Sequence, residues 1–131
     1  MTNPQRVVID TSTLVGAVLR PASVPRQAFM AAVSAHELCV SSATLDELRR
    51  VLGRAKFDRY APRQQRLDFG VLVAERSRLW EVDATSERTA TGACRDAKDD
   101  KFLALALACE AATLVSSDDD LLVLHPWQGI Q

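Results

Sequence analysis

Short apolar runs alternate along this sequence with longer segments whose apolar residues recur at helical spacing. The strand-like runs begin at residues 6, 37, 79 and 113, and they read RVVID, ELCV, LWEV and TLVSS. The helical segments cover 11–20, 24–36, 41–54, 62–78 and 96–111, and a polar loop is expected at 84–93. Strands that are separated by helices form a mainly parallel sheet with helices on both faces. The sequence therefore predicts an α/β fold, and 131 residues are most simply a single domain, residues 1–131.

The composition excludes several classes of protein. Apolar residues make up 47% of the chain and charged residues 25%, as in ordinary globular proteins. No run approaches the ~20 apolar residues of a transmembrane helix, and no secretory signal opens the chain. We therefore expect a cytoplasmic protein with no membrane segment. Cys39, Cys94 and Cys109 lack C-x-x-C spacing, which favours buried free thiols over a disulfide framework or a zinc site.

Apolar faces of the expected helices predict what packs against them. In the 62–78 helix, Leu67, Val71 and Ala74 are expected to face inward. The two N-terminal helices carry more apolar residues than one buried face requires. These residues are Leu14, Val15, Val18, Leu19, Val24, Ala28, Phe29, Ala32 and Val33. The surplus predicts a symmetric homodimer, although the 62–78 and 96–111 helices could cover the same residues.

The formal net charge of −1 conceals a separation of charge along the chain. Residues 49–66 contain seven basic residues against one acid, Asp58. These basic residues are Arg49, Arg50, Arg54, Lys56, Arg59, Arg63 and Arg66. Residues 96–120 contain seven acids against Lys98 and Lys101. The pattern suits an enzyme that holds a metal ion beside a bound polyanion, and a solvated helix face is the alternative for the basic segment.

Carboxylates follow the expected strands where a parallel sheet gathers its functional sites. Asp10 ends the first strand, Glu47 lies one turn into the helix after the second, and Asp118 follows the last. The 96–111 helix opens on three further acids, Asp96, Asp99 and Asp100. Sites in such sheets form outside the carboxyl ends of the strands. The acids are therefore predicted to meet at one edge and to hold a divalent metal ion.

Each acid also has a structural explanation. Asp10 could be the N-cap of the helix that follows it. Glu47 stands at capping-box spacing from Thr44 and at ion-pair spacing from Arg50. Asp96 could cap its helix and interact with the helix dipole, although three like charges on one face exceed what the dipole explains.

Four ordered motifs together resemble the PIN-domain nucleases, in particular the PIN-family toxins of bacterial toxin–antitoxin systems. The motifs are VVIDTSTLVGAVL, SSATLDELRRVLGRAKF, CRDAKDDKFLALALA with LVSSDDDLL, and HPWQGI. The resemblance covers essentially the whole chain. It implies a three-layer α/β/α fold with a four- or five-stranded sheet, and an endoribonuclease that uses Mg²⁺ or Mn²⁺. It also implies an RNA substrate, an antitoxin partner and a homodimer.

The resemblance assigns roles to individual residues. The catalytic and metal-binding acids of the family match Asp10, Glu47, Asp99 and Asp118, and Asp96 is a further metal ligand. Hard cations such as Mg²⁺ take oxygen ligands of this kind and activate water for phosphodiester hydrolysis.

Other positions depart from the pattern of the family. Ser12 stands where relatives commonly have an Asn that orients the first Asp, and Ser116 keeps the hydroxyl of the usual TGD motif. Relatives usually continue through a final strand where this sequence ends at Gln131.

The basic segment is expected to hold the RNA backbone. The residues assigned to RNA are Arg49, Arg50, Arg54, Lys56 and Arg63. A non-catalytic PIN-like module that binds RNA or protein is the main alternative, and retention of all four acids argues against it. A phospho-acceptor domain that uses Asp10 or Asp118 would want a lysine after a late strand, and none follows Lys101.

Overall fold

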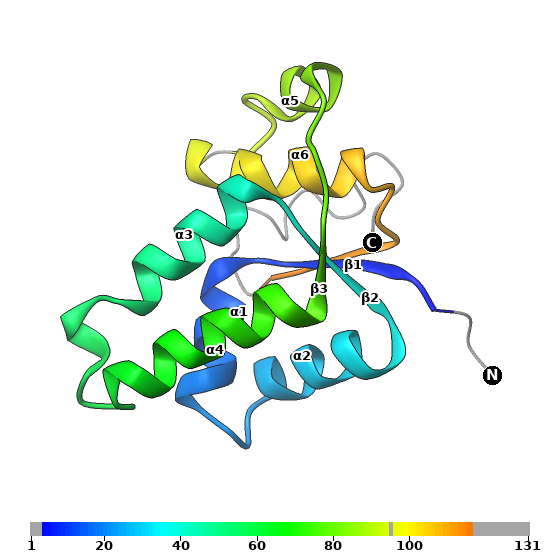
Figure 1. Cartoon of the computed structure of the whole chain (residues 1–131). Coiled ribbons are helices and arrows are strands. Elements are labelled where there is room, and N and C mark those ends of the chain that lie inside the picture. Colours follow the sequence, from blue (N-terminus) through cyan, green and yellow to red (C-terminus); the bar gives the residue numbers. More distant parts are fainter. Residues whose placement is uncertain (1–3, 95, 117–131) are drawn as a thin grey trace.

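Four short parallel strands lie at the centre of the part of the chain that this computed structural model describes, residues 4–94 and 96–116 (Figure 1). They are β1 (Arg6–Ile9), β2 (Glu37–Val40), β3 (Ser77–Leu79) and β4 (Thr113–Val115), in the order β3-β2-β1-β4. Every pairing is parallel. The expected parallel sheet is confirmed, and its third strand begins two residues before the predicted LWEV run.

The helices follow the expected order with two differences. They are α1 (Thr11–Leu19), α2 (Val24–Ala35), α3 (Ser42–Leu52), α4 (Arg63–Arg76), α5 (Ala84–Ala90) and α6 (Asp100–Ala108), with 3-10 turns η1 (Ala55–Phe57) and η2 (Ala97–Asp99).

The differences lie on the second half of the chain. The loop expected at 84–93 contains α5, because Asp83 caps that helix by accepting hydrogen bonds from the Ser86 amide and hydroxyl. These hydrogen bonds also lower the pKa of the Asp83 carboxyl. The helix expected at 96–111 is shorter, because η2 replaces its first turn and Glu110 adopts a left-handed backbone with φ of 53°.

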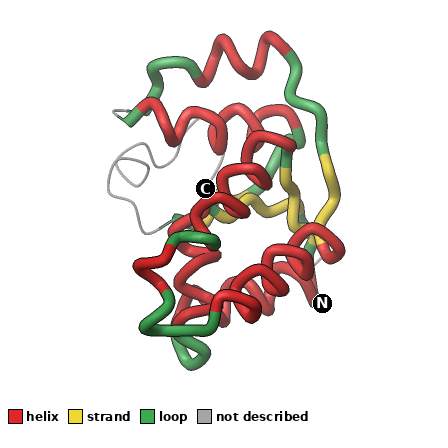
Figure 2. Tube along the Cα trace, turned by 60° about the vertical axis from the view of Figure 1, so that its left-hand side comes forward, coloured by secondary structure: helices red, strands yellow, loops and turns green. Residues whose placement is uncertain are grey.

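Helices cover the sheet on both faces, so the predicted three-layer arrangement is confirmed. Side chains alternate between the faces along each strand. Val7 and Ile9 of β1 join the core formed with α1, α2, α3 and α4. Val8 and Cys39 point to the opposite face and pack against α6, which α5 covers in turn. Figure 2 shows the strands between these two groups of helices.

The inward face of α4 differs from the prediction. Arg66, Phe69, Gly70 and Val73 are buried, whereas Val71 is 57% exposed. Phe69 packs against Phe29 of α2 with 5.0 Å between ring centroids. Gly70 gives the Leu52 side chain room, since an added Cβ would lie 3.1 Å from a Leu52 methyl carbon.

Arg66 is fully buried and holds the connection between α3 and α4 in place. Its guanidinium donates to the carbonyl oxygens of Leu52, Arg54 (2.9 Å) and Ala61 (3.1 Å), and it forms an ion pair with Asp58. A buried cation is stable only when its donors are satisfied in this way. Arg66 is therefore a structural residue and not part of a basic surface.

Most of the surplus apolar residues of the N-terminal helices are buried within the chain. The buried ones are Leu14, Val15, Val18, Phe29 and Ala32. Leu19, Ala28 and Val33 are partly exposed, and Val24 is 74% exposed. The alternative is therefore correct for the 62–78 helix, since α4 and also α3 pack on this face. It is wrong for the 96–111 helix, because α6 packs on the opposite face of the sheet.

Cys39, Cys94 and Cys109 are buried, as the sequence predicted. A hydrogen bond with Cys39 together with burial raises the pKa of the Cys109 thiol. None of the helices in the described part of the chain combines the length and the apolar character needed to cross a membrane.

Replacing Arg66 by Met should lower the free energy of unfolding by about 2–4 kcal/mol, because the carbonyls that it bonds lose their charged donor. Asp58 is 59% exposed and can return to water, which limits the loss. Urea denaturation measures the effect. Arg63→Met, at an exposed position of the same helix, is the control and should stay within about 0.5 kcal/mol of wild type. Equal stability of the two variants would contradict the structural role of Arg66.

Candidate functional site

Asp10 lies at the junction of β1, β4 and α1. Its carboxylate accepts hydrogen bonds from the Thr13 amide (3.0 Å) and from the hydroxyl of Ser116, and the Ser12 hydroxyl lies 3.4 Å from both its oxygens. Asp10 is thus the N-cap of α1, as its structural explanation proposed. The same contacts fix the carboxylate at the carboxyl edge of the sheet. Ser12 and Ser116, the two supporting residues that the sequence indicated, both contact it.

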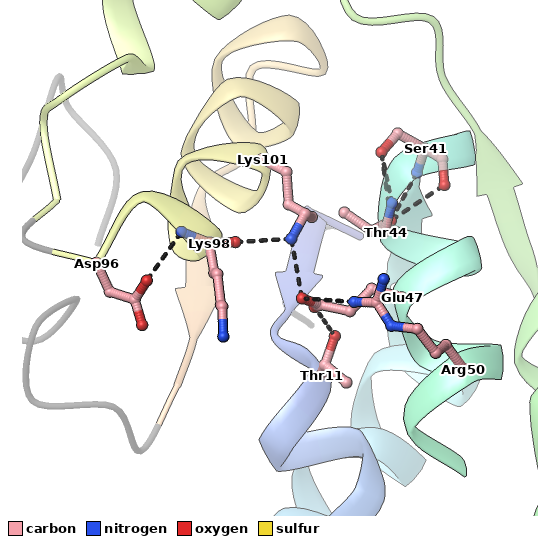
Figure 3. A network of polar contacts seen from close by, with 8 residues as sticks. All are labelled: Thr11, Ser41, Thr44, Glu47, Arg50, Asp96, Lys98 and Lys101. Atoms are coloured by element: carbon pink, nitrogen blue, oxygen red, sulfur yellow. Dashed lines mark hydrogen bonds and ion pairs between the residues drawn. The ribbon is translucent and has the colours of Figure 1, made fainter. Parts of the chain in front are cut away.

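Glu47 is held by donors at both carboxylate oxygens (Figure 3). One oxygen accepts from the Thr11 hydroxyl, and the other lies 2.8 Å from the Lys101 ammonium nitrogen and 4.0 Å from an Arg50 nitrogen. The expected pair with Arg50 is therefore present. The capping box expected between Thr44 and Glu47 is not, because Ser41 caps α3 and Thr44 completes that box.

The three acids of the 96–100 segment do not share one face, because Asp100 is separated from Asp96 and Asp99. Asp96 is exposed and caps η2 by accepting from the Lys98 amide at 2.9 Å. Asp99 is partly buried, with the Cys94 sulfur 3.8 Å from its carboxylate. Asp100 turns away and accepts from the Gly92 amide at 3.0 Å. The shared face needed one continuous α-helix from Asp96, and the 3-10 turn breaks that geometry.

A single cleft of about 570 Å³ brings the candidate acids together. Asp10, Glu47, Asp96 and Asp99 line it, together with the hydroxyl-bearing Thr11 and Ser12. Asp100 lines a different cleft, and Asp118 lies outside the described residues.

The donors of this cleft are of the type that suits a hard divalent cation. They are carboxylate and hydroxyl oxygens, the ligands of Mg²⁺ and Mn²⁺. Within residues 4–94 and 96–116, no three acidic, histidine or cysteine side chains lie close enough to hold one ion. Mg²⁺ needs only one or two carboxylates when water and substrate phosphate complete its shell. The residues present therefore fit such an ion.

Basic residues from α3 and η1 form one wall of the acidic cleft. Arg50, Arg54 and Lys56 line it, in agreement with a cation-rich surface beside the acids. Arg49 and Arg63, which the sequence grouped with them, are exposed elsewhere. Arg49 lies 3.7 Å from Asp46 on the outer face of α3, and Arg63 begins α4.

Sequence reasoning missed two residues whose side chains contact Glu47. Thr11 follows Asp10 directly and reaches Glu47, and Lys101 reaches the same carboxylate from α6. The one sequence feature that could have identified Thr11 and Lys101 is that each directly follows an acid, Asp10 and Asp100 respectively. Their contact with Glu47 joins segments 36 and 54 residues apart, and local spacing does not report such contacts.

Comparison with known proteins gives one family and similar solved structures. The PIN domain family matches residues 6–120. A chain of VapBC2 from Rickettsia felis, solved bound to a DNA fragment from the promoter, is similar with a TM-score of 0.65 and 15% identity, covering 95% of each chain. Mycobacterium tuberculosis VapC20, described as a sarcin-ricin loop cleaving toxin, has a TM-score of 0.60 and 13% identity, covering 91% of this chain and 95% of its own. No curated protein sequence shows significant similarity to the chain.

The capping role of Asp10 predicts different effects for two substitutions. Asp10→Ala should lower the free energy of unfolding by about 1–2 kcal/mol, because the Thr13 amide and the Ser116 hydroxyl lose their acceptor. Asp10→Asn should remain within about 0.5 kcal/mol of wild type, because asparagine caps helices as well as aspartate. Thermal or urea unfolding of the two variants tests this. A loss for Asn as large as that for Ala would show that the charge, and not the cap, stabilises this junction.

Proposed function

The chain belongs to the PIN domain family, and from that premise we propose that it is an endoribonuclease that depends on Mg²⁺ or Mn²⁺. The observation that carries the proposal is the cleft that Asp10, Glu47 and Asp99 line together with the basic residues Arg50, Arg54 and Lys56. An acidic centre bordered by basic side chains can bind both a metal ion and the phosphate backbone of a nucleic acid.

In this proposal Asp10, Glu47, Asp96 and Asp99 hold the ion, together with Asp118, which lies outside the described residues. When bound, such an ion would supply an activated water for phosphodiester hydrolysis. The protein contributes the orientation of the acids. Ser12, Ser116 and the Thr13 amide fix Asp10, and Thr11 fixes one oxygen of Glu47. Oriented carboxylates need no rearrangement when charge develops at the phosphate.

We further propose that the protein is the toxin of a toxin–antitoxin pair, with a cognate antitoxin protein as its partner. Support comes from the similar structures, which are a VapBC2 chain and a toxin that cleaves the sarcin-ricin loop. An RNA substrate fits the cytoplasmic location expected from the sequence. The homodimer stays a prediction, since most of the apolar residues that motivated it are buried within the chain.

A non-catalytic RNA- or protein-binding module is the second candidate. Two observations favour it. Glu47 is neutralised by Lys101, and no three acids of the described residues lie close enough to hold one ion. Such a module would need the basic wall of the cleft and not its acids. Substitution of the acids therefore discriminates between the two functions.

Asp99→Asn should reduce metal-dependent RNA cleavage by about 100-fold or more, because a ligand charge is lost. Asp10→Asn should do the same while leaving the fold intact. Cleavage of a labelled RNA by purified protein, with Mn²⁺ or with chelator, measures the effect. Asp46→Asn removes an exposed acid of α3 and is the matched control. Undiminished cleavage by Asp99→Asn, with contaminating nuclease excluded, would remove Asp99 from the mechanism.

The wall of the cleft predicts which basic residues contact RNA. Arg54→Gln should weaken RNA binding and reduce the slope of log K against log salt by about 0.7, the value for one lost contact with a single strand. Arg63→Gln, which lies away from the cleft, should leave that slope near wild type. Binding titrations over a range of salt concentrations measure both. The opposite pattern would place the RNA along α4 instead of along the cleft.

A further inference from the structure

The ion pair between Glu47 and Lys101 occupies the carboxylate that the proposed metal site requires. Lys101 Nζ lies 2.8 Å from Glu47 Oε1, and the other Glu47 oxygen accepts from Thr11. The side chains of Glu47 and Lys101 are only 12% and 25% exposed. Both oxygens of Glu47 are therefore engaged by donors, and water screens the pair incompletely.

Lys101 is itself well anchored. Its ammonium also donates to the Lys98 carbonyl at 2.8 Å, and Figure 3 shows the side chain pointing from α6 toward Glu47 on α3. A lysine in a solvent-exposed ion pair loses side-chain entropy and contributes little to stability. Because two acceptors lie at hydrogen-bond distance, the Lys101 ammonium group has a defined position.

The pair stands between two clefts. Glu47 lines the acidic cleft, and Lys101 lines a neighbouring cleft of about 630 Å³. Two exposed acids, Glu81 and Glu87, also line that second cleft. An ammonium group that leaves Glu47 therefore has space and opposite charge beside it.

A divalent cation and an ammonium group cannot share Glu47 Oε1 without strong repulsion. We propose that Lys101 is a positioning residue that holds Glu47 in the metal-free protein and competes with the divalent ion for its carboxylate. Binding of the ion then releases Lys101 toward the second cleft. This inference rests on the proposed metal-dependent function.

A purely structural ion pair would give a different result. If Lys101 only linked α6 to α3, its removal would change stability and leave affinity for metal unchanged. Competition predicts instead that removing the ammonium group makes Glu47 available and tightens metal binding.

The test is titration with Mn²⁺ alone, followed by calorimetry or by the electron paramagnetic resonance of the free ion. Lys101→Met should lower the dissociation constant for Mn²⁺ by about 5-fold, the range expected for a partly screened pair. Lys101→Gln should do the same, and Lys101→Arg, which keeps the charge, should stay near wild type. Lys98→Met is the matched control, because it removes one positive charge from the lining of the acidic cleft and spares the pair.

A double-mutant cycle separates the pair from general electrostatics. In a Glu47→Gln background, Lys101→Met should no longer tighten Mn²⁺ binding, because the contested carboxylate is gone. Circular dichroism establishes that each variant is folded, and any one folded Lys101 variant without charge is sufficient for the comparison.

The outcomes distinguish this inference from the function on which it rests. Wild-type protein that binds Mn²⁺ together with unchanged or weaker binding by Lys101→Met overturns the competition alone. Equal tightening by Lys98→Met overturns it as well, since the effect would then be one of net charge. Wild-type protein that binds no Mn²⁺ at millimolar concentration overturns the metal-dependent function and the inference together.

Discussion

Parallel pairing of β1 with a strand on each side is the constraint on which the candidate site depends. β2 and β4 flank β1, and the Asp10 amide extends the ladder by donating to the Val115 carbonyl at 3.1 Å. The carboxyl ends of β1 and β4 therefore meet, and Ser116 comes within hydrogen-bond distance of Asp10 although 106 residues separate them. Without this register, the first acid would have neither its orientation nor its neighbours.

Charge balance is the second determinant of the site. Acids that gather at one sheet edge repel one another unless cations or hydrogen-bond donors compensate them. Here three of the described acids are compensated by donors, with helix amides at Asp10 and Asp96 and an ammonium group at Glu47. In the proposed function, the same interactions that stabilise the protein would determine how readily its carboxylates take up a metal ion.

The sequence predicted the fold more completely than the contacts within it. Strand and helix order follow from local composition, and the parallel sheet follows from their alternation. The inward face of α4 was not predicted correctly. An arginine is expected at the surface, and only the tertiary structure shows that backbone carbonyls bind the Arg66 guanidinium in the interior. The separation of Asp100 from Asp99 was not predicted either. It depends on a 3-10 turn in place of the first turn of an α-helix, and local sequence does not distinguish the two.

What the sequence determined by itself is which residues stand at the ends of strands and helices. That was enough to place Asp10, Glu47, Asp96 and Asp99 at one edge, where a single cleft now joins them. Tertiary structure alone decided their partners. Thr11 and Lys101 contact Glu47, from which they are 36 and 54 residues apart in the sequence. Arg66 lies in the interior and not on the basic surface. The physical reason is that periodicity reports which face of an element is apolar, whereas a hydrogen bond between elements depends on how their axes and registers meet in space.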